Sequence, residues 1–281
     1  MSELEALLLG IVQGLTEFLP ISSSGHLIFV PWLQDYRFLL DNPDFNRTFD
    51  VALHAGTLVA AVAYFRREIR TLTAGFLNTI PKRAIETADE RLAWAIAVGT
   101  VPAVIVGAFG EGVIEDHLAE PWLASIMLIV FGLVLLNADG RPEERGVEST
   151  RLRDGLWIGL AQVVSLIPGT SRSGITITAG RYLGLDRDAA ARVSFLLLVP
   201  VAFGAAVFSG AEAAIEGLPE GVAGPIAVGT IAAAVSGYAA IAWLLRLVRT
   251  RSYAPFVAYR VLAGGFFLLL IATGARSATF G

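Results

Sequence analysis

Six long apolar stretches alternate with charged segments along the chain. They cover residues 49–65, 92–109, 122–136, 190–208, 226–247 and 256–273. A helix of about 20 residues crosses a hydrocarbon core about 30 Å thick, and each stretch approaches or reaches that length. The pattern therefore predicts an all-α integral membrane protein with six transmembrane helices.

Two further apolar stretches are shorter and end at a proline. Residues 4–19 stop at Pro20 and continue into ISSSGHL, and residues 155–167 stop at Pro168 and continue into GTSRSGIT. Each arm would reach only about 18–24 Å, and a second short apolar arm follows each polar turn. Irregular polar backbone survives at membrane depth only inside protein or beside a water-filled cavity. We therefore expect two re-entrant helical hairpins whose tips lie near the middle of the membrane.

The composition agrees with a lipid solvent and excludes several kinds of function. The chain is 55% hydrophobic and 16% charged, with a mean hydropathy of +0.65, whereas soluble domains are about 45–50% apolar and about 25% charged. The net charge of −4 gives no reason to expect a nucleic-acid partner. Cysteine is absent, which excludes disulfides, thiolate nucleophiles and cysteine metal sites.

The charges between the apolar stretches predict how the helices are oriented. Lys and Arg gather within 66–91, within 138–153 and near residue 250, whereas 110–121 and 210–224 contain acidic residues but no Lys or Arg. Basic loops stay in the cytoplasm under the positive-inside rule. We therefore expect a multi-pass protein of the plasma membrane with both termini outside, and we interpret the arginines of the cytoplasmic loops as topology signals.

The two halves of the chain resemble each other in the same order. GIVQ at Gly10 matches GLAQ at Gly159, SSSG at 22–25 matches SRSG at 171–174, and IAVGT at 96–100 recurs at 226–230. Each half, 1–140 and 150–281, holds one hairpin and three spans. Because three is odd, the second half must be inverted, so the hairpins enter from opposite sides and can meet within one membrane domain. Inverted-topology repeats with broken helices are a known membrane architecture.

The two turns carry the residues that could perform chemistry. The first hairpin supplies Gln13, Glu17, Ser22, Ser23, Ser24, Gly25 and His26, and the second supplies Gly169, Thr170, Ser171, Arg172, Ser173, Gly174 and Thr176. A lone charge at the bilayer centre costs roughly 2.5–3.5 kcal/mol, so Glu17 and Arg172 should meet each other or a ligand. Arginine forks and glycine-rich helix N-termini both bind phosphate. The pattern therefore favours chemistry on an anion.

The same two segments resemble a known family. QGLTEFLPISSSGH (13–26) and PGTSRSGIT (168–176) closely resemble the signature motifs of the undecaprenyl-diphosphate phosphatase family of the bacitracin-resistance type. The similarity runs over nearly the whole chain and includes FDVALHAGT at 49–57. The resemblance implies hydrolysis of undecaprenyl diphosphate to the monophosphate, which recycles the lipid carrier of cell-wall glycan synthesis. It also implies a divalent cation, Mg²⁺ or Ca²⁺, and a site that opens to the outer face.

The resemblance further implies roles for individual residues. The catalytic positions are Glu17, Ser23, Ser24, His26 and Arg172. The substrate-binding positions are Gln13, Ser22, Gly25, Gly169, Thr170, Ser171, Ser173, Gly174 and Thr176. Glu17 and Gln13 would hold the metal. Many members have Glu where this chain has Gln13, and because an amide is a weaker ligand, Glu17 should supply the main charge.

The working hypothesis leaves several alternatives open. A hydroxyl of Ser23 or Ser24 attacks the diphosphate or orients a water, and Glu17 or His26 takes the proton. A lipid flippase or anion transporter on the same repeats is the alternative function. An isoprenyl diphosphate lipid is the expected partner, and both its chain length and a homodimer are left open.

Three other polar residues lie close to these motifs or inside a span. His54 and Asp50 open the first span and could support the site or only cap and pack the helix. Arg260 lies one turn into the last span, and we expect it to snorkel to the cytoplasmic interface.

Overall fold

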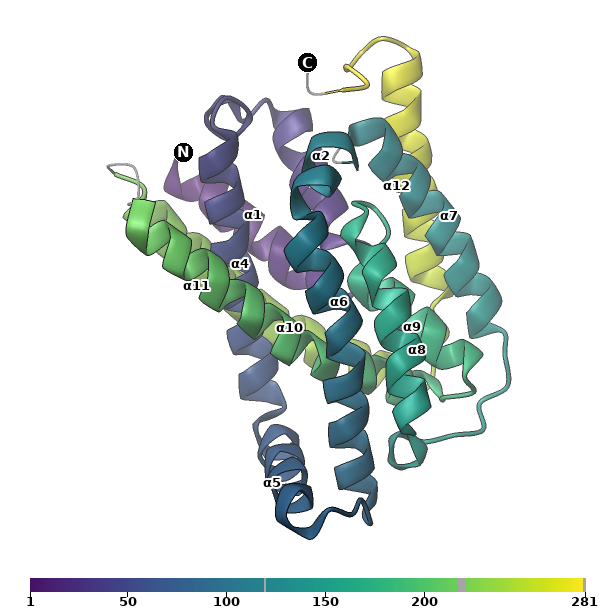
Figure 1. The fold of residues 1–281 in the computed structure, drawn as a ribbon. Coiled ribbons are helices and arrows are strands. Elements are labelled where there is room, and N and C mark those ends of the chain that lie inside the picture. The colour runs from purple at the N-terminus through teal and green to yellow at the C-terminus, as the bar shows by residue number, and fades with distance from the viewer. Residues whose placement is uncertain (119, 217–220, 280–281) are drawn as a thin grey trace.

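Helices build the fold throughout the described residues. The computed structural model describes residues 1–118, 120–216 and 221–279, with their side chains except those of 108–117 and 209–216. In chain order (Figure 1) the helices are α1 (Glu3–Phe18), α2 (Ser23–Gln34), α3 (Arg37–Leu40), α4 (Pro43–Tyr64), α5 (Arg66–Lys82), α6 (Ala88–Leu118), α7 (Pro121–Asp139), α8 (Leu152–Val163), α9 (Arg172–Tyr182), α10 (Arg187–Glu216), α11 (Ala223–Leu247) and α12 (Ala254–Ala272). Short 3₁₀ turns lie at Val147–Ser149 and Val164–Leu166. The prediction of an all-α fold is confirmed.

Five helices are long and apolar enough to cross a membrane. They are Ala88–Gly107 of α6, Arg187–Phe208 of α10, and the whole of α7, α11 and α12. The expected span at 49–65 falls in α4, which qualifies only together with α5, across a bend of 82°. The described residues therefore support five or six spans, and the sixth stays a prediction.

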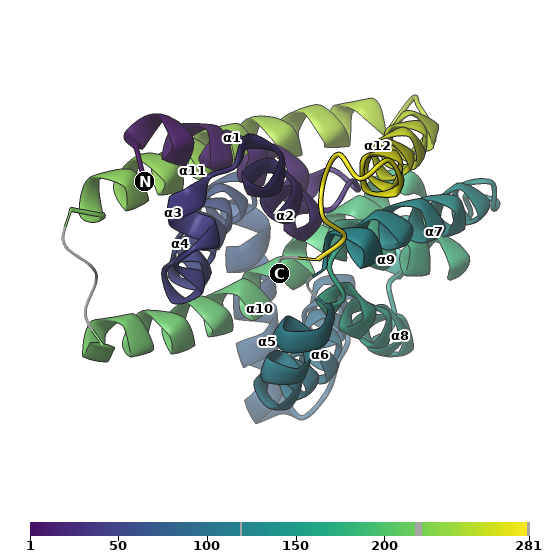
Figure 2. The ribbon, with the colours of Figure 1, turned by 90° about the horizontal axis from the view of Figure 1, so that it is seen from above.

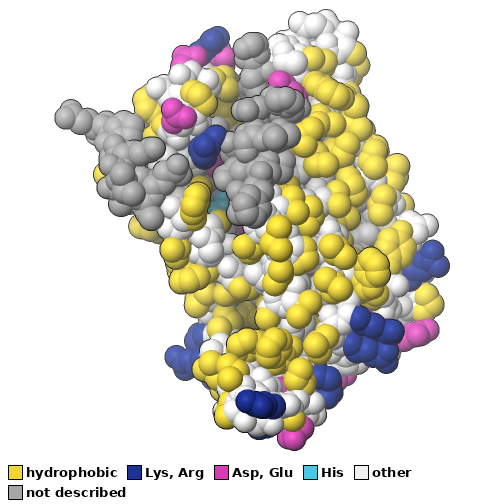
Figure 3. Space-filling model, in the orientation of Figure 1, with side chains coloured by type: hydrophobic (Ala, Val, Ile, Leu, Met, Phe, Trp, Pro, Cys, Tyr) yellow, Lys and Arg dark blue, Asp and Glu magenta, His cyan; other side chains and the backbone are white. Residues whose placement is uncertain are grey.

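The surface of the bundle is apolar where lipid would lie. Leu262, Val235 and Phe203 are 73%, 68% and 61% exposed. Figure 3 shows hydrophobic side chains over most of one face and Lys and Arg side chains gathered toward its lower end. Patches of this extent mark a membrane or protein contact. The acidic residues of 111–116 and 212–220 that entered the orientation argument lie outside the described side chains.

Each segment expected to form a hairpin contains short helices joined by a turn, and its re-entrant path through a membrane stays a prediction. Helix α1 ends at Phe18 just before Pro20, and α2 begins at Ser23. In the second half, α8 and a 3₁₀ turn end before Pro168, and α9 begins at Arg172. Viewed from above (Figure 2), α1 and α11 lie along one side, α5, α6 and α8 along the other, and α2 and α10 between them.

Each glycine that begins the matched GIVQ and GLAQ segments packs against a glycine in the other half of the chain. A Cβ on Gly10 of α1 would lie 2.3 Å from the carbonyl oxygen of Gly229 in α11. A Cβ on Gly159 of α8 would lie 2.2 Å from the carbonyl oxygen of Gly99 in α6. Close backbone approach at small residues is a common means of packing membrane helices. The first helix of each half is thus packed on a helix of the other half.

An ion pair with a buried carboxylate holds the loop between α7 and α8. Arg145 Nη2 lies 2.5 Å from Asp154 Oδ2, and the Asp154 side chain is completely buried. Arg145 also donates to the carbonyl oxygen of Leu183. Arg145 therefore has a structural contact in addition to its predicted role as a topology signal, and that role stays a prediction. Its carboxylate partner is itself buried inside protein, which the charge pattern could not reveal.

Replacing Gly10 with alanine should destabilise the protein, because α1 and α11 would have to move apart to admit the new methyl group. Overpacking of this kind costs about 1–3 kcal/mol, and thermal unfolding of the purified protein in detergent would measure it. Gly204→Ala is the matched control, since nothing lies within 4 Å of a Cβ there. Equal melting temperatures for the two variants would contradict the close packing.

Candidate active site

The two turns have nearly the same backbone geometry. Ser22 has φ 75° and ψ 97°, and Ser171 has φ 75° and ψ 114°. The hydroxyl of each accepts a hydrogen bond from a glycine amide three residues later, Gly25 at 3.3 Å and Gly174 at 3.1 Å. Side-chain caps of this kind stabilise a helix start by about 1 kcal/mol. The repeated S-x-S-G sequence therefore builds the same helix start twice.

The turns lie against each other. Ser173 Oγ donates to the carbonyl oxygen of Leu19 at 3.1 Å. A Cβ on Gly25 would lie 3.5 Å from the Cα of Gly169, so the backbones pack directly. Two segments about 150 residues apart in the sequence thus form one polar centre inside the bundle. The N-termini of α2 and α9 both begin there.

Glu17 is the residue that joins the two turns chemically. Its Oε1 accepts from Arg172 Nη2 at 2.9 Å, and its Oε2 accepts from Ser23 Oγ at 2.6 Å. Gln13 Nε2 donates to Oε2 at 3.2 Å, and His54 Nε2 lies 3.7 Å from the same oxygen. The expectation that Glu17 and Arg172 meet is confirmed. His54, which the sequence left between two roles, contacts the central carboxylate.

Burial differs sharply across this cluster. The Glu17 side chain is 6% exposed and that of Arg172 is 14% exposed, whereas His54 is 41% exposed. A buried charge is tolerated when it is paired and hydrogen-bonded, and the two buried groups satisfy each other. His54 is therefore the most exposed of these three side chains.

Arg172 is held by a second contact that the motifs did not indicate. Its Nη1 donates to the carbonyl oxygen of Ser194 in α10 at 2.9 Å. The hydroxyls of Ser194 and Thr176 lie 2.7 Å apart. The guanidinium is therefore fixed between α1 and α10. A backbone carbonyl acceptor leaves no mark in a sequence, so Ser194 could not have been selected.

His26 is bonded at both ring nitrogens. Its Nδ1 lies 2.6 Å from the carbonyl oxygen of Ser22, and its Nε2 lies 2.6 Å from the hydroxyl of Tyr259 in α12. A carbonyl can only accept, so Nδ1 carries the proton, and in the neutral ring Nε2 accepts from Tyr259. The ring thereby ties the first turn to α12. A catalytic role for His26 stays a prediction.

Arg260 lies in the interior, and the expectation that it snorkels to the interface was wrong. Its side chain is completely buried. The guanidinium donates to the carbonyl oxygens of Pro20, Gly169 and Thr170 at 3.2, 3.1 and 2.9 Å. It therefore reaches both turns. The sequence position one turn into α12 suggested the interface, but the acceptors that hold the side chain inside are backbone atoms.

The remaining predicted residues divide between hydroxyl pairs and unpaired atoms. Ser24 Oγ lies 3.3 Å from Ser22 Oγ, and Ser173 Oγ lies 3.2 Å from Ser171 Oγ. Thr170 Oγ1 and Gln13 Oε1 are buried without a hydrogen-bond partner among the described residues. A hydroxyl and an amide oxygen that are buried without partners beside a cluster of charges call for an explanation, and a bound ligand that hydrogen-bonds to them is one.

The protein oxygens at this site fit a cation whose other ligands are oxygens of substrate phosphate and water. Within the described residues there is no group of three or more His, Asp or Glu side chains that could hold a metal ion. Glu17 supplies a carboxylate and Gln13 Oε1 supplies the unpaired amide oxygen. Mg²⁺ is often held by one or two carboxylates plus substrate phosphate and water. The two residues therefore fit a cation shared with a phosphate.

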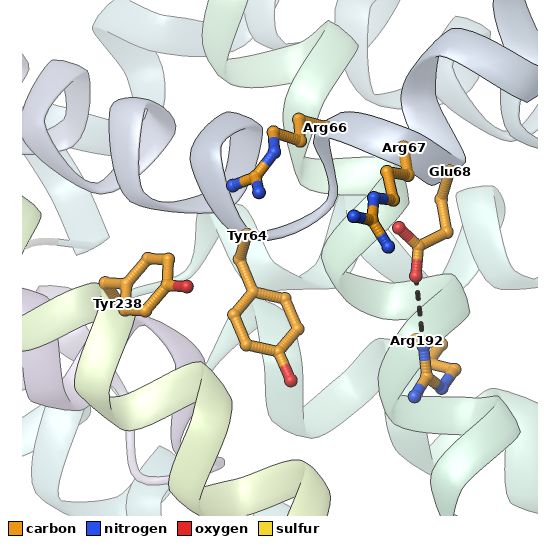
Figure 4. Close-up of a pocket in the computed structure, with 6 residues that line it drawn as sticks. All are labelled: Tyr64, Arg66, Arg67, Glu68, Arg192 and Tyr238. Atoms are coloured by element: carbon orange, nitrogen blue, oxygen red, sulfur yellow. Dashed lines mark hydrogen bonds and ion pairs between the residues drawn. The ribbon is translucent and has the colours of Figure 1, made fainter.

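A cavity of about 350 Å³ lies elsewhere, at the bend between α4 and α5. It is lined by Tyr64, Arg66, Arg67, Glu68, Arg192 and Tyr238. Figure 4 shows the arginines around this opening and the contact of Arg192 with Glu68, which measures 3.5 Å. None of these residues belongs to the predicted set. The polar centre at the two turns is therefore a different place from this basic cavity.

Comparison with known proteins shows the family to which the chain belongs. The family model described as Bacitracin resistance protein BacA matches residues 6–266. The chain belongs to this family. A protein named undecaprenyl-diphosphatase from Geobacter sulfurreducens is 47% identical over 267 residues, which cover 94% of this chain and 97% of the relative. Relatives of the same name are 46% identical over 277 residues in Pelobacter propionicus (98% and 99% covered) and 45% identical over 281 residues in a Nocardioides species (98% of each). The resemblance drawn from the two motifs is confirmed.

Proposed function

We propose that this chain hydrolyses undecaprenyl diphosphate to the monophosphate and phosphate in the plasma membrane, and so recycles the lipid carrier of cell-wall glycan synthesis. The observation that carries the proposal is the contact of one carboxylate, Glu17, with both a hydroxyl and a guanidinium. The names of the relatives, which match over nearly the whole chain, support the substrate.

Ser23 is the proposed nucleophile. A nucleophile and its base stand within hydrogen-bond reach of each other, at about 2.6–3.2 Å, and Ser23 Oγ lies 2.6 Å from Glu17 Oε2. Ser24 is bonded instead to Ser22. Ser23 Oγ attacks the terminal phosphorus, its proton passes to Glu17, and the bond from that phosphorus to the bridging oxygen breaks. Water then hydrolyses the phosphoserine and returns the hydroxyl.

Arg172 and the two helix starts bind the phosphoryl group that is transferred. A guanidinium has five N–H donors, and Arg172 uses one on Glu17 and one on Ser194. The other donors have no hydrogen-bond partner recorded among the described residues and would face the phosphoryl oxygens, where negative charge develops during transfer. The N-termini of α2 and α9 add backbone amides and the positive ends of two helix dipoles.

Glu17 and Gln13 are the proposed holders of a divalent cation, Mg²⁺ or Ca²⁺. Such an ion would offset the negative charge of the diphosphate. Gln13 Oε1 supports this assignment because it is buried and has no partner in the described residues. The amide oxygen cannot take a proton at neutral pH, which leaves the proton to Glu17.

The proposed architecture has six spans and two re-entrant hairpins in inverted repeats, with the site open to the outer face. The start of α1 and the end of α12 lie at the end of the bundle opposite α5 (Figure 1), whose sequence carries three of the arginines. Basic segments remain in the cytoplasm, which supports an outer location for both termini. The reciprocal contacts of Gly10 with Gly229 and of Gly159 with Gly99 support the repeat.

Purified protein in detergent should release phosphate from undecaprenyl diphosphate, and Arg172→Met should lose about a thousandfold in kcat because transition-state charge loses its cation. Glu17→Gln should lose about a hundredfold or more because the base is gone. Glu3→Gln and Arg70→Met change exposed residues and serve as matched controls. No membrane gradient exists in detergent, so a flippase without hydrolase activity would release nothing. Near-normal rates in either site variant would overturn the mechanism.

Ser23→Ala and Ser24→Ala form an internally matched pair on one turn. The first variant removes the hydroxyl bonded to Glu17 and should lower kcat about a hundredfold or more, as expected when a nucleophile is lost. The second removes a hydroxyl that, within the described part of the chain, is bonded only to Ser22, and it should stay within about tenfold of the parent. Phosphate release by both variants under saturating substrate measures the difference. The reverse order would assign the nucleophile to Ser24.

The absence of cysteine allows a direct test of orientation by single substitutions. Asp41→Cys and Ser277→Cys, both exposed, should react in intact cells with a maleimide that cannot cross membranes. Arg83→Cys, in the turn after α5, should react only after the cells are permeabilised. Labelling of Arg83→Cys in intact cells would reverse the proposed orientation.

A further inference from the structure

Arg260, which was not among the predicted site residues, donates hydrogen bonds to both turns. Its Nη1 donates to Pro20 in the first turn, and its Nη2 donates to Gly169 and Thr170 in the second. A further set of bonds anchors it to α7, where Nε donates to Leu128 at 2.9 Å and Nη2 to Met127 at 3.3 Å. One side chain therefore links α7, α12 and both turns.

The chemistry of these contacts requires an arginine. Within the described residues, all five acceptors are backbone carbonyl oxygens and none is a carboxylate. A buried cation without an acid partner is costly unless dipoles surround it. A guanidinium offers five donors in a rigid fork, whereas a lysine offers three from a single point. Arg260 can therefore hold carbonyls in several directions at once.

The carbonyls that Arg260 holds belong to the peptides next to the catalytic residues. Thr170 precedes Ser171 and Arg172, and Pro20 lies three residues before Ser23. The peptide bonds of the described residues are trans, so a carbonyl held toward Arg260 sends the following N–H in the opposite direction. Fixing Thr170 O thus fixes the direction of the Ser171 N–H at the start of α9.

Two glycines leave the space that the side chain occupies. A Cβ on Gly132 of α7 would lie 3.2 Å from Arg260 Cβ and 3.4 Å from its Nε. A Cβ on Gly174 of α9 would lie 2.8 Å from Nη1. The Arg260 side chain therefore reaches from α12 to the turns through space that glycines of α7 and α9 leave open.

We propose that Arg260 is a positioning residue for phosphate transfer, which holds the two turns in the register that puts Ser23 and Glu17 opposite Arg172. The inference rests on the proposed function. Arg260 bonds to the carbonyls behind the turns and has no bond to Glu17, Ser23 or Arg172 themselves. It acts through the backbone: if it is lost, the turns shift and the reacting groups separate.

Arg260→Met and Arg260→Lys test the proposal with undecaprenyl diphosphate as the probe. A displacement of about 1 Å in a catalytic group can cost a hundredfold in rate, so kcat of Arg260→Met should fall by about that factor. KM should change little, since Arg172 and the helix starts remain. Arg260→Lys keeps the charge and part of the bonding and should recover part of the loss. Arg276→Met is the matched control, because Arg276 also donates to a carbonyl, that of Leu33, away from the turns.

A second pair of variants keeps every charge in place. Gly132→Ala crowds Arg260 without removing it, and kcat should fall several-fold. Gly265→Ala in α12 meets nothing within 4 Å and should leave kcat unchanged. This pair decides the question if Arg260→Met fails to fold.

The possible outcomes distinguish a failure of the positioning role of Arg260 from a failure of the proposed function. A folded Arg260→Met protein with a lowered melting temperature but a kcat within about threefold of the parent would make Arg260 merely structural and overturn the proposal. For a non-folding Arg260→Met, equal kcat values for Gly132→Ala and Gly265→Ala would overturn it. A parent protein that releases no phosphate would instead overturn the proposed function on which the inference rests.

Discussion

The contact between Glu17 and Arg172 is the interaction on which the rest of the structure depends. Each charge lies in an apolar bundle, and breaking a buried pair by removing one partner typically costs about 3–5 kcal/mol. The two residues come from turns that are distant in the sequence, so they can pair only if both turns reach the same depth. The packing of α1 on α11 and of α8 on α6 at paired glycines brings the turns to that depth, and Arg260 holds their backbones there.

One carboxylate then organises the chemistry. Oε1 of Glu17 holds Arg172, while Oε2 accepts the hydroxyl of Ser23. The guanidinium proposed to bind phosphate and the hydroxyl proposed to attack it are therefore both bonded to the same carboxylate. His26 is hydrogen-bonded to the Ser22 carbonyl and to Tyr259 rather than to Glu17. Gln13 completes the cluster with an amide whose oxygen has no partner in the described residues.

The sequence predicted the parts of this arrangement that follow from the cost of burying polar groups. Helical spans, two broken helices and the pairing of Glu17 with Arg172 were all predictable on that basis. The contact of Glu17 with Ser23 and not with Ser24 was not predictable, because it depends on the direction in which each hydroxyl leaves the turn. Arg260 was misplaced because its acceptors are backbone carbonyls, which every residue has. The sixth span does not follow from composition alone, because α4 begins with the largely polar segment 43–50 and passes as a span only together with α5.

A double-mutant cycle on Glu17 and Arg172 tests the central claim most directly. The value of kcat/KM for phosphate release from undecaprenyl diphosphate would be measured for the parent, Glu17→Gln, Arg172→Met and the double variant. Residues that act as a unit give strongly non-additive losses. The account predicts that the double variant is little worse than the worse single variant. Losses that multiply would contradict it, since the two side chains would then act independently.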